Sequence, residues 1–319
     1  MRSYFAWLVG FALVVISSVA SILAYKYFVL GDLHSDPRLG QLLRYQKEKI
    51  KNHAAIAETA LVGDSSLGNA VDARLFGQLT GAPAINLALT GTFHYGGAYA
   101  QLKALANGPN RIRSVVLMYA VDAPASELSL DGAFFMSPNP VVAGLDAGTN
   151  LRLVKNYVQR LTDGSAVVDF IWRSATGRVD TTIPPELYVH DYAVAYGLIK
   201  LEDNGFRIPR RAAEMGRGFM PLIGELCKEQ GWVCVYAHGP LVDYAFGLSG
   251  MAAADYFFSV ESEFRSLGIT LATPQPVLLP PEQRGDSFFH VHPNFRSVTT
   301  RHYAKILEPF LARPAGGNL

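Results

Sequence analysis

The sequence has little of what marks small secreted scaffolds and nucleic-acid-binding proteins. It has only two cysteines in 319 residues, which excludes a disulfide-rich scaffold. Its 28 basic and 27 acidic residues nearly cancel to a net charge of +1, so the broad basic surface that nucleic-acid binding needs is not expected. Charged residues make up 17% and hydrophobic residues 50%, which excludes a disordered chain and predicts one large or two small folded domains.

Charge is absent altogether near the N-terminus. From Tyr4 to Ala24 no residue is charged, and this length is about enough to cross ~30 Å of hydrocarbon. We therefore predict a membrane anchor over residues 1–30, retained because a cleaved signal peptide has a shorter apolar core. Arg2 precedes the apolar segment, which favours an inner-membrane protein whose N-terminus is inside and whose body is exported to the periplasm or extracellular space.

The two cysteines fit an exported body in two ways. Cys227 and Cys234 lie seven positions apart in LCKEQGWVC. In an oxidising compartment they could form a disulfide. As two buried thiols they would simply join a helix to a strand, and the sequence leaves both interpretations open.

The remainder reads as a stalk followed by an α/β body. Residues 31–58 are polar and indicate a stalk or a short surface helix, and residues 59–319 form the body. Within the body, short β-rich runs alternate with helical ones, which predicts parallel βαβ units. The expected strands are 59–63, 84–89, 114–121, 232–237 and 269–272, and the expected helices are 67–79, 95–106, 220–230, 252–266 and 296–311.

One long region interrupts this alternation. Residues 123–211 are aromatic-rich, are punctuated by Pro and Gly, and have no clear strand period. We interpret them as an insertion over the carboxyl edge of the sheet, forming a lid or a substrate wall.

The first chemically informative motif is Gly63-Asp64-Ser65-Ser66, where the first strand turns into a helix. Asp and Ser are ordinary helix caps. A serine at this position is also a candidate nucleophile, because the first N–H groups of a helix lack intrahelical partners and can hold the oxyanion formed on a carbonyl.

The second motif follows the second strand, in NLALTGTFHYGG. Asn86 ends that strand, and Gly91 lies in the turn into the next helix. Glycine lets the backbone approach a bound carbonyl, so the Gly91 N–H is a candidate oxyanion donor and Asn86 a candidate substrate-binding residue. A plain turn glycine is the alternative.

The third motif is GDSFFHVHPNFRS, which precedes the last helix. Asp286, His290 and His292 lie within seven residues. A serine nucleophile needs a base and a group that orients the base, and an acid close to a histidine can supply both from one loop. The H-x-H pattern could instead hold Zn²⁺. No other His or Cys cluster supports a metal, so we expect neither metal nor cofactor.

Together these three motifs resemble the SGNH, or GDSL, hydrolase superfamily. The resemblance is carried by Gly63-Asp64-Ser65, the segment Asn86 to Gly91, and His292-Pro293-Asn294, in the family's order. It implies a flavodoxin-like three-layer α/β/α fold that performs ester hydrolysis or acyl transfer. Ser65 then matches the nucleophile, His292 the base, and the N–H groups of Ser65 and Gly91 the oxyanion donors, with Asp64 in the same block.

The chain departs from the family pattern at two places. The family's G-x-N-D block corresponds to Tyr119 to Asp122, which keeps only the final Asp and lacks the asparagine donor. The family's D-x-x-H spacing is also off register, because Asp286 stands four residues before His290 and six before His292. The base is therefore either histidine, and the H-P-N match favours His292.

An anchored domain of this type is similar to accessory proteins that work beside membrane-bound O-acyltransferases. That resemblance implies that a polytopic partner supplies an acyl group, with acetyl expected, and that Ser65 passes it to a hydroxyl of a cell-surface or secreted polysaccharide. Two alternatives stay open. One is an esterase or carbohydrate deacetylase, and the other is a non-catalytic scaffold or glycan-binding subunit of an envelope complex.

Overall fold

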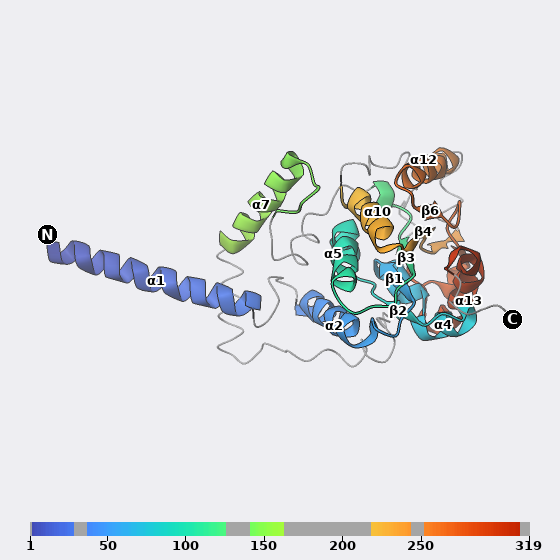
Figure 1. Cartoon of the computed structure of the whole chain (residues 1–319), viewed down its shortest axis with the longest axis horizontal. Helices are drawn as coiled ribbons and strands as arrows, with labels where there is room; N and C mark the ends of the chain where they lie inside the picture. Colours follow the sequence, from blue (N-terminus) through green and yellow to red (C-terminus); the bar gives the residue numbers. More distant parts are fainter. Residues whose placement is uncertain (1, 29–36, 126–140, 163–217, 244–251, 313–319) are drawn as a thin grey trace.

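The computed structural model describes residues 2–28, 37–125, 141–162, 218–243 and 252–312 (Figure 1). Its centre is a parallel sheet of five strands in the order β2-β1-β3-β4-β6. The strand bounds are β1 Thr59–Gly63, β2 Ala84–Asn86, β3 Ser114–Tyr119, β4 Val233–His238 and β6 Thr270–Leu271. This α/β architecture agrees with the predicted flavodoxin-like class, because the order 2-1-3-4-5 among the sheet strands is the order of that doubly wound fold.

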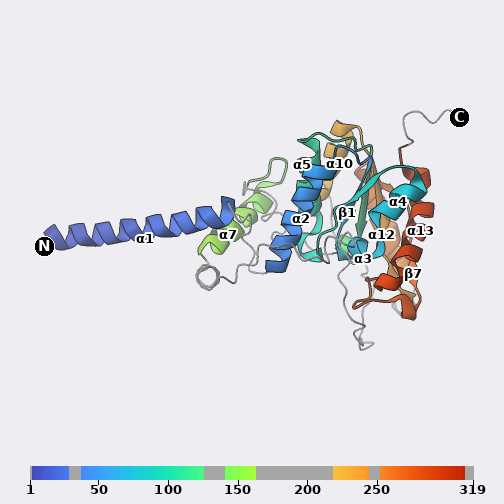
Figure 2. The ribbon, with the colours of Figure 1, turned by 90° about the horizontal axis from the view of Figure 1, so that it is seen from below.

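Helices cover both faces of the sheet (Figures 1 and 2). On one face lie α5 (His94–Ala106), α10 (Phe219–Gln230) and α12 (Ala252–Ser266), which bury side chains such as Leu102, Ile223 and Phe264. On the other lie α3 (Ser65–Ala70), α4 (Ala73–Thr80) and α13 (Arg296–Leu307), with Leu67, Phe76 and Tyr303 buried among them. The elements agree closely with the expected ranges, except that the helix expected at 67–79 is two helices.

The break between α3 and α4 has a local cause. Val71 is extended, and the Asp72 side chain caps the next helix by accepting a hydrogen bond from the Leu75 N–H at 3.0 Å. An aspartate that caps a new helix stops the previous one, because the capping residue must leave helical geometry.

At the N-terminus, α1 (Arg2–Phe28) is a helix of 27 residues. It projects away from the α/β body in both ribbon views (Figures 1 and 2). Across the described part of the chain, no helix combines the length and apolar character required to cross a bilayer. The membrane anchor over residues 1–30 stays a prediction.

The segment expected to be a stalk contributes a helix to the body. Helix α2 (Pro37–His53) buries Leu42 and Leu43 in the core and lies along the outer edge of β2. Gln46 Nε2 donates to the Ala88 carbonyl at 2.6 Å, and Lys49 Nζ donates to the Asn86 carbonyl at 2.7 Å. These carbonyls face away from β1, so α2 satisfies main-chain groups that an edge strand would otherwise leave unpaired.

Two other features were not predicted from the sequence. Strands β5 (Leu241–Val242) and β7 (Leu278–Leu279) form a small parallel sheet beyond the end of β4. Within the expected insertion, the structure describes a short 3-10 turn, η2 (Ala123–Ala125), and helix α7 (Ala147–Thr162). Residues 126–140 and 163–211 of the predicted lid lie outside the described residues.

The cysteine question is settled in favour of the disulfide. Cys227, near the end of α10, is bonded to Cys234 in β4, with Cα atoms 6.2 Å apart. The bond fastens a covering helix to the strand beside it.

Candidate functional site

The candidate nucleophile stands at the first position of α3, directly beyond the end of β1. Gly63 is required just before it, because a Cβ atom there would lie 1.8 Å from the Met118 carbonyl oxygen of β3. Ser65 is half-buried, and Asn69 holds its carbonyl by donating from Nδ2 at 2.8 Å. The turn lies between the ends of β1 and β3, where the strand order reverses, which is the usual ligand position in such sheets.

Asp64 fixes this turn. The residue is 4% exposed and caps α3, with Oδ1 accepting from the Ser66 N–H at 2.9 Å and from the Ser66 hydroxyl at 2.6 Å. Its Oδ2 accepts from the Ala120 N–H at 3.0 Å, which ties the turn to the end of β3. Asp64 was predicted among the oxyanion and substrate-binding residues. That assignment is wrong for an oxyanion donor, because a carboxylate only accepts hydrogen bonds and both oxygens are engaged within the fold.

The candidate base and acid lie in one constrained loop, residues 283–292, which we call the Asp286–His290 loop. An antiparallel bridge joins Arg284 to Val291, and the Gly285 N–H donates to the His290 carbonyl at 2.7 Å. Glycine suits this close approach, since a Cβ atom at 285 would lie 3.2 Å from that carbonyl oxygen. The small β5–β7 sheet lies next to the loop, where the Val242 N–H donates to the Phe288 carbonyl at 2.9 Å.

The structure brings Ser65, His290 and Asp286 into one chain of hydrogen bonds. His290 Nε2 is 2.8 Å from Ser65 Oγ, and His290 Nδ1 is 2.5 Å from Asp286 Oδ1. A carboxylate can only accept, so Nδ1 carries the proton, and Nε2 is left to accept the proton of the serine hydroxyl. The His290 and Asp286 side chains are 16% and 14% exposed, which shields the pair while leaving a path to solvent.

The histidine that the structure places against Ser65 is His290 and not His292, the residue preferred as the base. His292 caps the 3-10 turn η5 (Pro293–Phe295), with Nδ1 accepting from the Asn294 N–H at 3.3 Å. The Pro293 ring and this cap hold His292 in the segment just before α13. The H-P-N match favoured His292, but the bridge between Arg284 and Val291 shapes the loop so that the imidazole of His290 faces Ser65 Oγ.

Gly91 lies at the same edge as Ser65. The chain continues pairing beyond β2, with the Leu89 N–H donating to the Gly63 carbonyl at 2.8 Å. The 3-10 turn η1 (Gly91–Phe93) begins two residues later, and Gly91 is exposed with open space around its Cα. The Ser66 N–H is already held by Asp64, so the N–H groups of Ser65 and Gly91 remain the candidate oxyanion donors.

Asn86 does not reach the site. It is fully buried, its Nδ2 donates to the Val71 carbonyl at 2.9 Å, and its Oδ1 accepts from the Ala88 N–H at 2.9 Å. Both ends of the amide that was predicted to bind substrate are engaged by backbone groups, and they fix β2 to the end of α3.

Sequence reasoning missed two positioning residues. Asn69 lies one helical turn after Ser65, a spacing that could have identified it. Arg296, at the start of α13, is 6% exposed and donates to the Gly68 and Val71 carbonyls at 3.0 and 2.8 Å. It therefore caps the end of the helix that carries Ser65, and no local sequence signal links residues more than 220 positions apart.

The end of β3 departs from the family's third block in structure as well as in sequence. Val121 occupies the place of the missing asparagine, is fully buried, and accepts a hydrogen bond from the Tyr256 hydroxyl through its carbonyl. Burial, together with the nearby negative charge of Asp64, raises the pKa of Asp122. The site therefore has no side-chain amide donor at this position.

His94 adds strain at the same edge. Its φ of 41° is positive, which is rare for a residue other than glycine. His94 Nε2 lies 3.1 Å from the Ala123 carbonyl oxygen. Because a carbonyl oxygen can only accept, Nε2 carries the proton and donates. Burial lowers the pKa of His94. The Tyr119 hydroxyl, which donates to the His94 carbonyl at 3.1 Å, holds the strained backbone in place.

No residues for a metal centre come together: the described part of the chain has no group of three or more His, Cys, Asp or Glu side chains suited to one. Comparison with known proteins adds no information about the site, so its geometry alone supports an assignment. No family model matches the chain, and neither a curated protein nor a solved structure does.

Proposed function

We propose that this chain is a serine-dependent acyl-transferring enzyme of the SGNH type. The observation that carries the proposal is the continuous hydrogen-bonded path from Ser65 Oγ through His290 to Asp286. A nucleophile, a base within hydrogen-bond reach and a carboxylate that orients the base are the three groups that covalent acyl chemistry needs.

The mechanism follows from these contacts. His290 Nε2 accepts the Ser65 proton as Oγ attacks an ester or thioester carbonyl, and the N–H groups of Ser65 and Gly91 stabilise the resulting oxyanion. The imidazolium then protonates the leaving alcohol or thiol, which departs and leaves an acyl ester on Ser65. An incoming hydroxyl, deprotonated by His290, attacks this ester. The tetrahedral intermediate then breaks its bond to Ser65 Oγ, which takes the proton back from His290, and the acyl group leaves on the acceptor.

We infer transfer to a polysaccharide hydroxyl rather than hydrolysis as the physiological second step. The inference depends on the predicted anchor over residues 1–30 and the similarity to accessory proteins of membrane-bound O-acyltransferases. The Cys227–Cys234 disulfide supports an exported body, because such bonds persist in oxidising compartments. In this proposal the polytopic partner supplies the acyl group and the body works outside the inner membrane.

A direct test is to trap the acyl-enzyme. The full chain in detergent micelles is incubated with 4-nitrophenyl acetate, and intact mass and peptide mapping locate the adduct. We expect a single acetyl group on Ser65. Ser65→Ala should reduce turnover by about 10⁶-fold, whereas Ser297→Ala, at an exposed position of α13, should leave it unchanged.

Three outcomes would contradict parts of the proposal. An adduct that persists in Ser65→Ala would exclude Ser65 as the nucleophile. With an oligosaccharide added, free acetate without acetylated sugar would favour the esterase or deacetylase alternative, and absence of any adduct or turnover would favour the non-catalytic binding subunit.

A further inference from the structure

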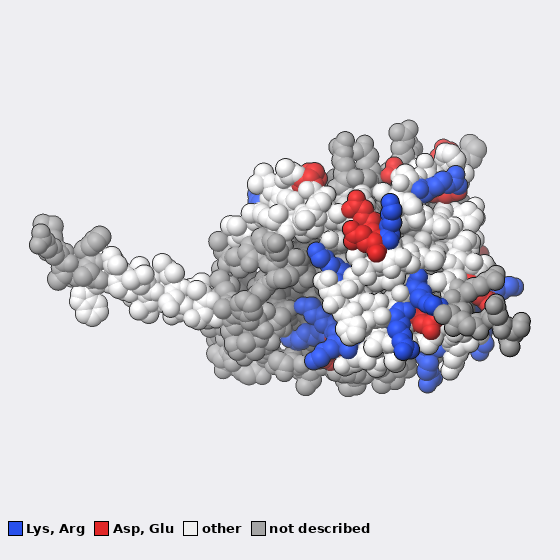
Figure 3. Space-filling model, viewed as in Figure 1, with Lys and Arg blue, Asp and Glu red and all other residues white. Residues whose placement is uncertain are grey.

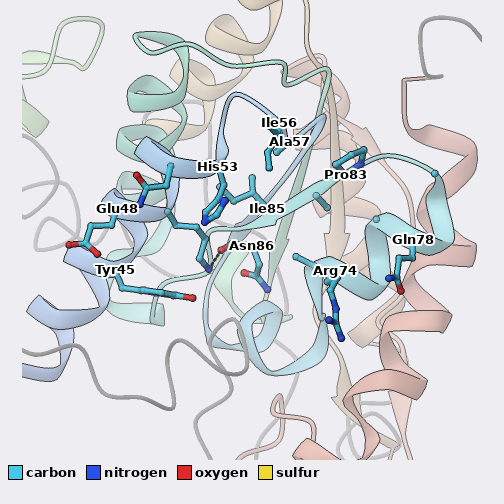
Figure 4. Close-up of a pocket in the computed structure, with 16 residues that line it drawn as sticks. Tyr45, Glu48, His53, Ile56, Ala57, Arg74, Gln78, Pro83, Ile85 and Asn86 are labelled. Atoms are coloured by element: carbon cyan, nitrogen blue, oxygen red, sulfur yellow. Dashed lines mark hydrogen bonds between the residues drawn. The ribbon is translucent and has the colours of Figure 1, made fainter.

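An enzyme that transfers an acyl group from Ser65 must hold an acceptor molecule beside it. A cavity of about 880 Å³ opens at the outer edge of β2 between α2 and α4 (Figure 4). Its lining includes neither Ser65 nor any residue of the Asp286–His290 loop. Groups that bind the acceptor are therefore to be sought on the surface around the candidate triad itself.

His290 and His292 point to the same side of their loop. The bridge between Arg284 and Val291 keeps this segment extended, and side chains alternate in direction along an extended chain. Val291, between the two histidines, is 1% exposed and packs in the core, whereas both histidines are partly exposed. Because the His290 imidazole faces Ser65 Oγ, the His292 imidazole lies on the same face, about 7 Å farther along the chain.

Gln283 joins this face from the other strand of the bridge. The His292 N–H donates to the Gln283 carbonyl at 2.8 Å, so the two residues stand opposite each other. Opposite side chains of an antiparallel pair lie on one face, with Cβ atoms about 5 Å apart. The Gln283 amide therefore lies beside the His292 imidazole.

The His292 ring has one nitrogen engaged and the other available. Nδ1 accepts from the Asn294 N–H at 3.3 Å, so the ring proton is on Nε2. The Phe295 ring meets the imidazole edge-on, with centroids 6.2 Å apart, and restricts its rotation. His292 Nε2 and the Gln283 side-chain amide have no hydrogen-bond partner among the described residues. The pair thus offers N–H donors and one carbonyl acceptor to a ligand.

The chemistry of this face suits a neutral ligand. The residues that share it carry no ammonium or guanidinium group: Gln283, Gly285, His290 and His292. Arg284 points to the opposite side, together with its bridge partner Val291. Elsewhere, the face of the molecule seen in Figure 3 shows basic and acidic side chains mixed rather than gathered by sign. Amide and imidazole groups match hydroxyl groups, which both donate and accept hydrogen bonds.

We propose that His292 and Gln283 form an acceptor subsite for a neutral polysaccharide. Their side chains bind hydroxyl groups of the acceptor, while a neighbouring hydroxyl reaches His290 and takes the acyl group from Ser65. The identification of the ligand as an acceptor rests on the function proposed above. The binding itself depends on these two side chains and not on formation of the acyl-enzyme.

The test separates acceptor binding from acyl-enzyme formation. The full chain in detergent micelles is mixed with 4-nitrophenyl acetate, and the burst of 4-nitrophenolate reports acylation of Ser65. Maltohexaose or hexagalacturonate is added as the acceptor, and mass spectrometry measures the acetylated sugar. The key variant is His292→Asn, because asparagine can keep the cap on the Asn294 N–H but has no group in the place of Nε2.

We expect the wild type to acetylate maltohexaose in preference to hexagalacturonate. His292→Asn should raise the KM for maltohexaose by about tenfold, and Gln283→Ala by about threefold or more, through loss of hydrogen bonds to the acceptor. The burst rate of both variants should fall by less than about threefold, a split that a structural defect would not produce. His302→Asn, at an exposed histidine of α13, is the matched control and should change neither quantity.

Three results would overturn the subsite. An unchanged KM in either variant removes that residue from it. A burst rate in His292→Asn that falls as far as the KM rises would mean that His292 acts on Ser65 and not on the acceptor. Equal transfer to hexagalacturonate would exclude selection of a neutral chain.

Failure of the proposed function would look different, because the wild type would then give no burst or no acetylated sugar. Calorimetry with maltohexaose decides the subsite in that case. Ser65→Ala should bind the sugar, and the double variant with His292→Asn should bind it about tenfold more weakly. Equal binding by the two proteins, or none by Ser65→Ala, would overturn the subsite.

Discussion

Two histidines near the carboxyl edge of the sheet have opposite surroundings. His290, in the Asp286–His290 loop, is 16% exposed and has a partner at each ring nitrogen. His238, at the end of β4, is fully buried among aromatic rings such as Phe257, and neither ring nitrogen has a partner among the described residues. Burial lowers the pKa of His238 to about 3.

The difference teaches what makes a histidine useful as a base. An imidazole that accepts a proton must be able to hold the resulting charge, and Asp286 provides for this at His290. His238 has no such group among the described residues and stays neutral throughout the physiological range. Position at the functional edge of the sheet is therefore insufficient without a partner for the charged form.

The largest expected effect comes from removing the partnered imidazole. His290→Ala should lower ester turnover by about 10⁶-fold, since base and nucleophile act as one unit. His292→Ala is the matched control in the same loop and should lose less than about tenfold. Steady-state kinetics with 4-nitrophenyl acetate measure both, and a larger loss in His292→Ala would restore the family-based assignment.

Changing the carboxylate should have the next largest effect. Asp286→Asn keeps the shape but removes the acceptor that holds the proton on Nδ1, so turnover should fall by about 10⁴-fold. Its pH–rate profile should differ in shape from the wild-type profile, because no carboxylate orients the His290 imidazole in this variant. Wild-type turnover in Asp286→Asn would show that the pair is only structural.

At β4, the Cys227–Cys234 disulfide should contribute more to stability than His238 does. Cys227→Ser with Cys234→Ser opens a short loop and should lower the free energy of unfolding by about 2–3 kcal/mol. Urea denaturation of the oxidised wild type and the double variant measures this difference. An unchanged midpoint would mean that the bond adds nothing to the packing of α10 on β4.

The smallest effect concerns pH and His238. The native pKa is about 3 and the unfolded value about 6.5, so the unfolded chain binds more protons between these values. The contribution of neutral His238 to the free energy of unfolding is complete above about pH 6.5 and is lost as the pH falls toward 3. At pH 5 the loss amounts to about 2 kcal/mol.

Chemical denaturation at pH 7 and pH 5 checks this prediction. His238→Phe keeps an aromatic ring beside Phe257 and should flatten the dependence on pH. His302→Gln, at an exposed histidine of α13, should not. An identical pH dependence in wild type and His238→Phe would contradict the burial argument.

Much of the fold could be predicted because the periodic patterns are local. β1 and α12 have the expected bounds, and the other sheet strands and main helices differ from theirs by a few residues. The division of the helix expected at 67–79 was missed although its cause, the cap at Asp72, is local. The other failures depended on side chains that act across the chain. The polar character of α2 concealed its role as a cover for the β2 edge, and the spacing of Asp286 could not choose between His290 and His292.

The sequence by itself determined the alternating α/β plan, the strand-to-helix turn with Ser65, and the acid and histidines before the last helix, because these follow from neighbouring residues. Only the tertiary structure decided which histidine meets the serine, that Asp64 and Asn86 serve the fold, and that α2 and α4 enclose a cavity. The physical reason is that hydrogen-bond partners are chosen by distance and direction in space. The Ser65–His290 contact joins residues 225 positions apart, and no local pattern encodes it.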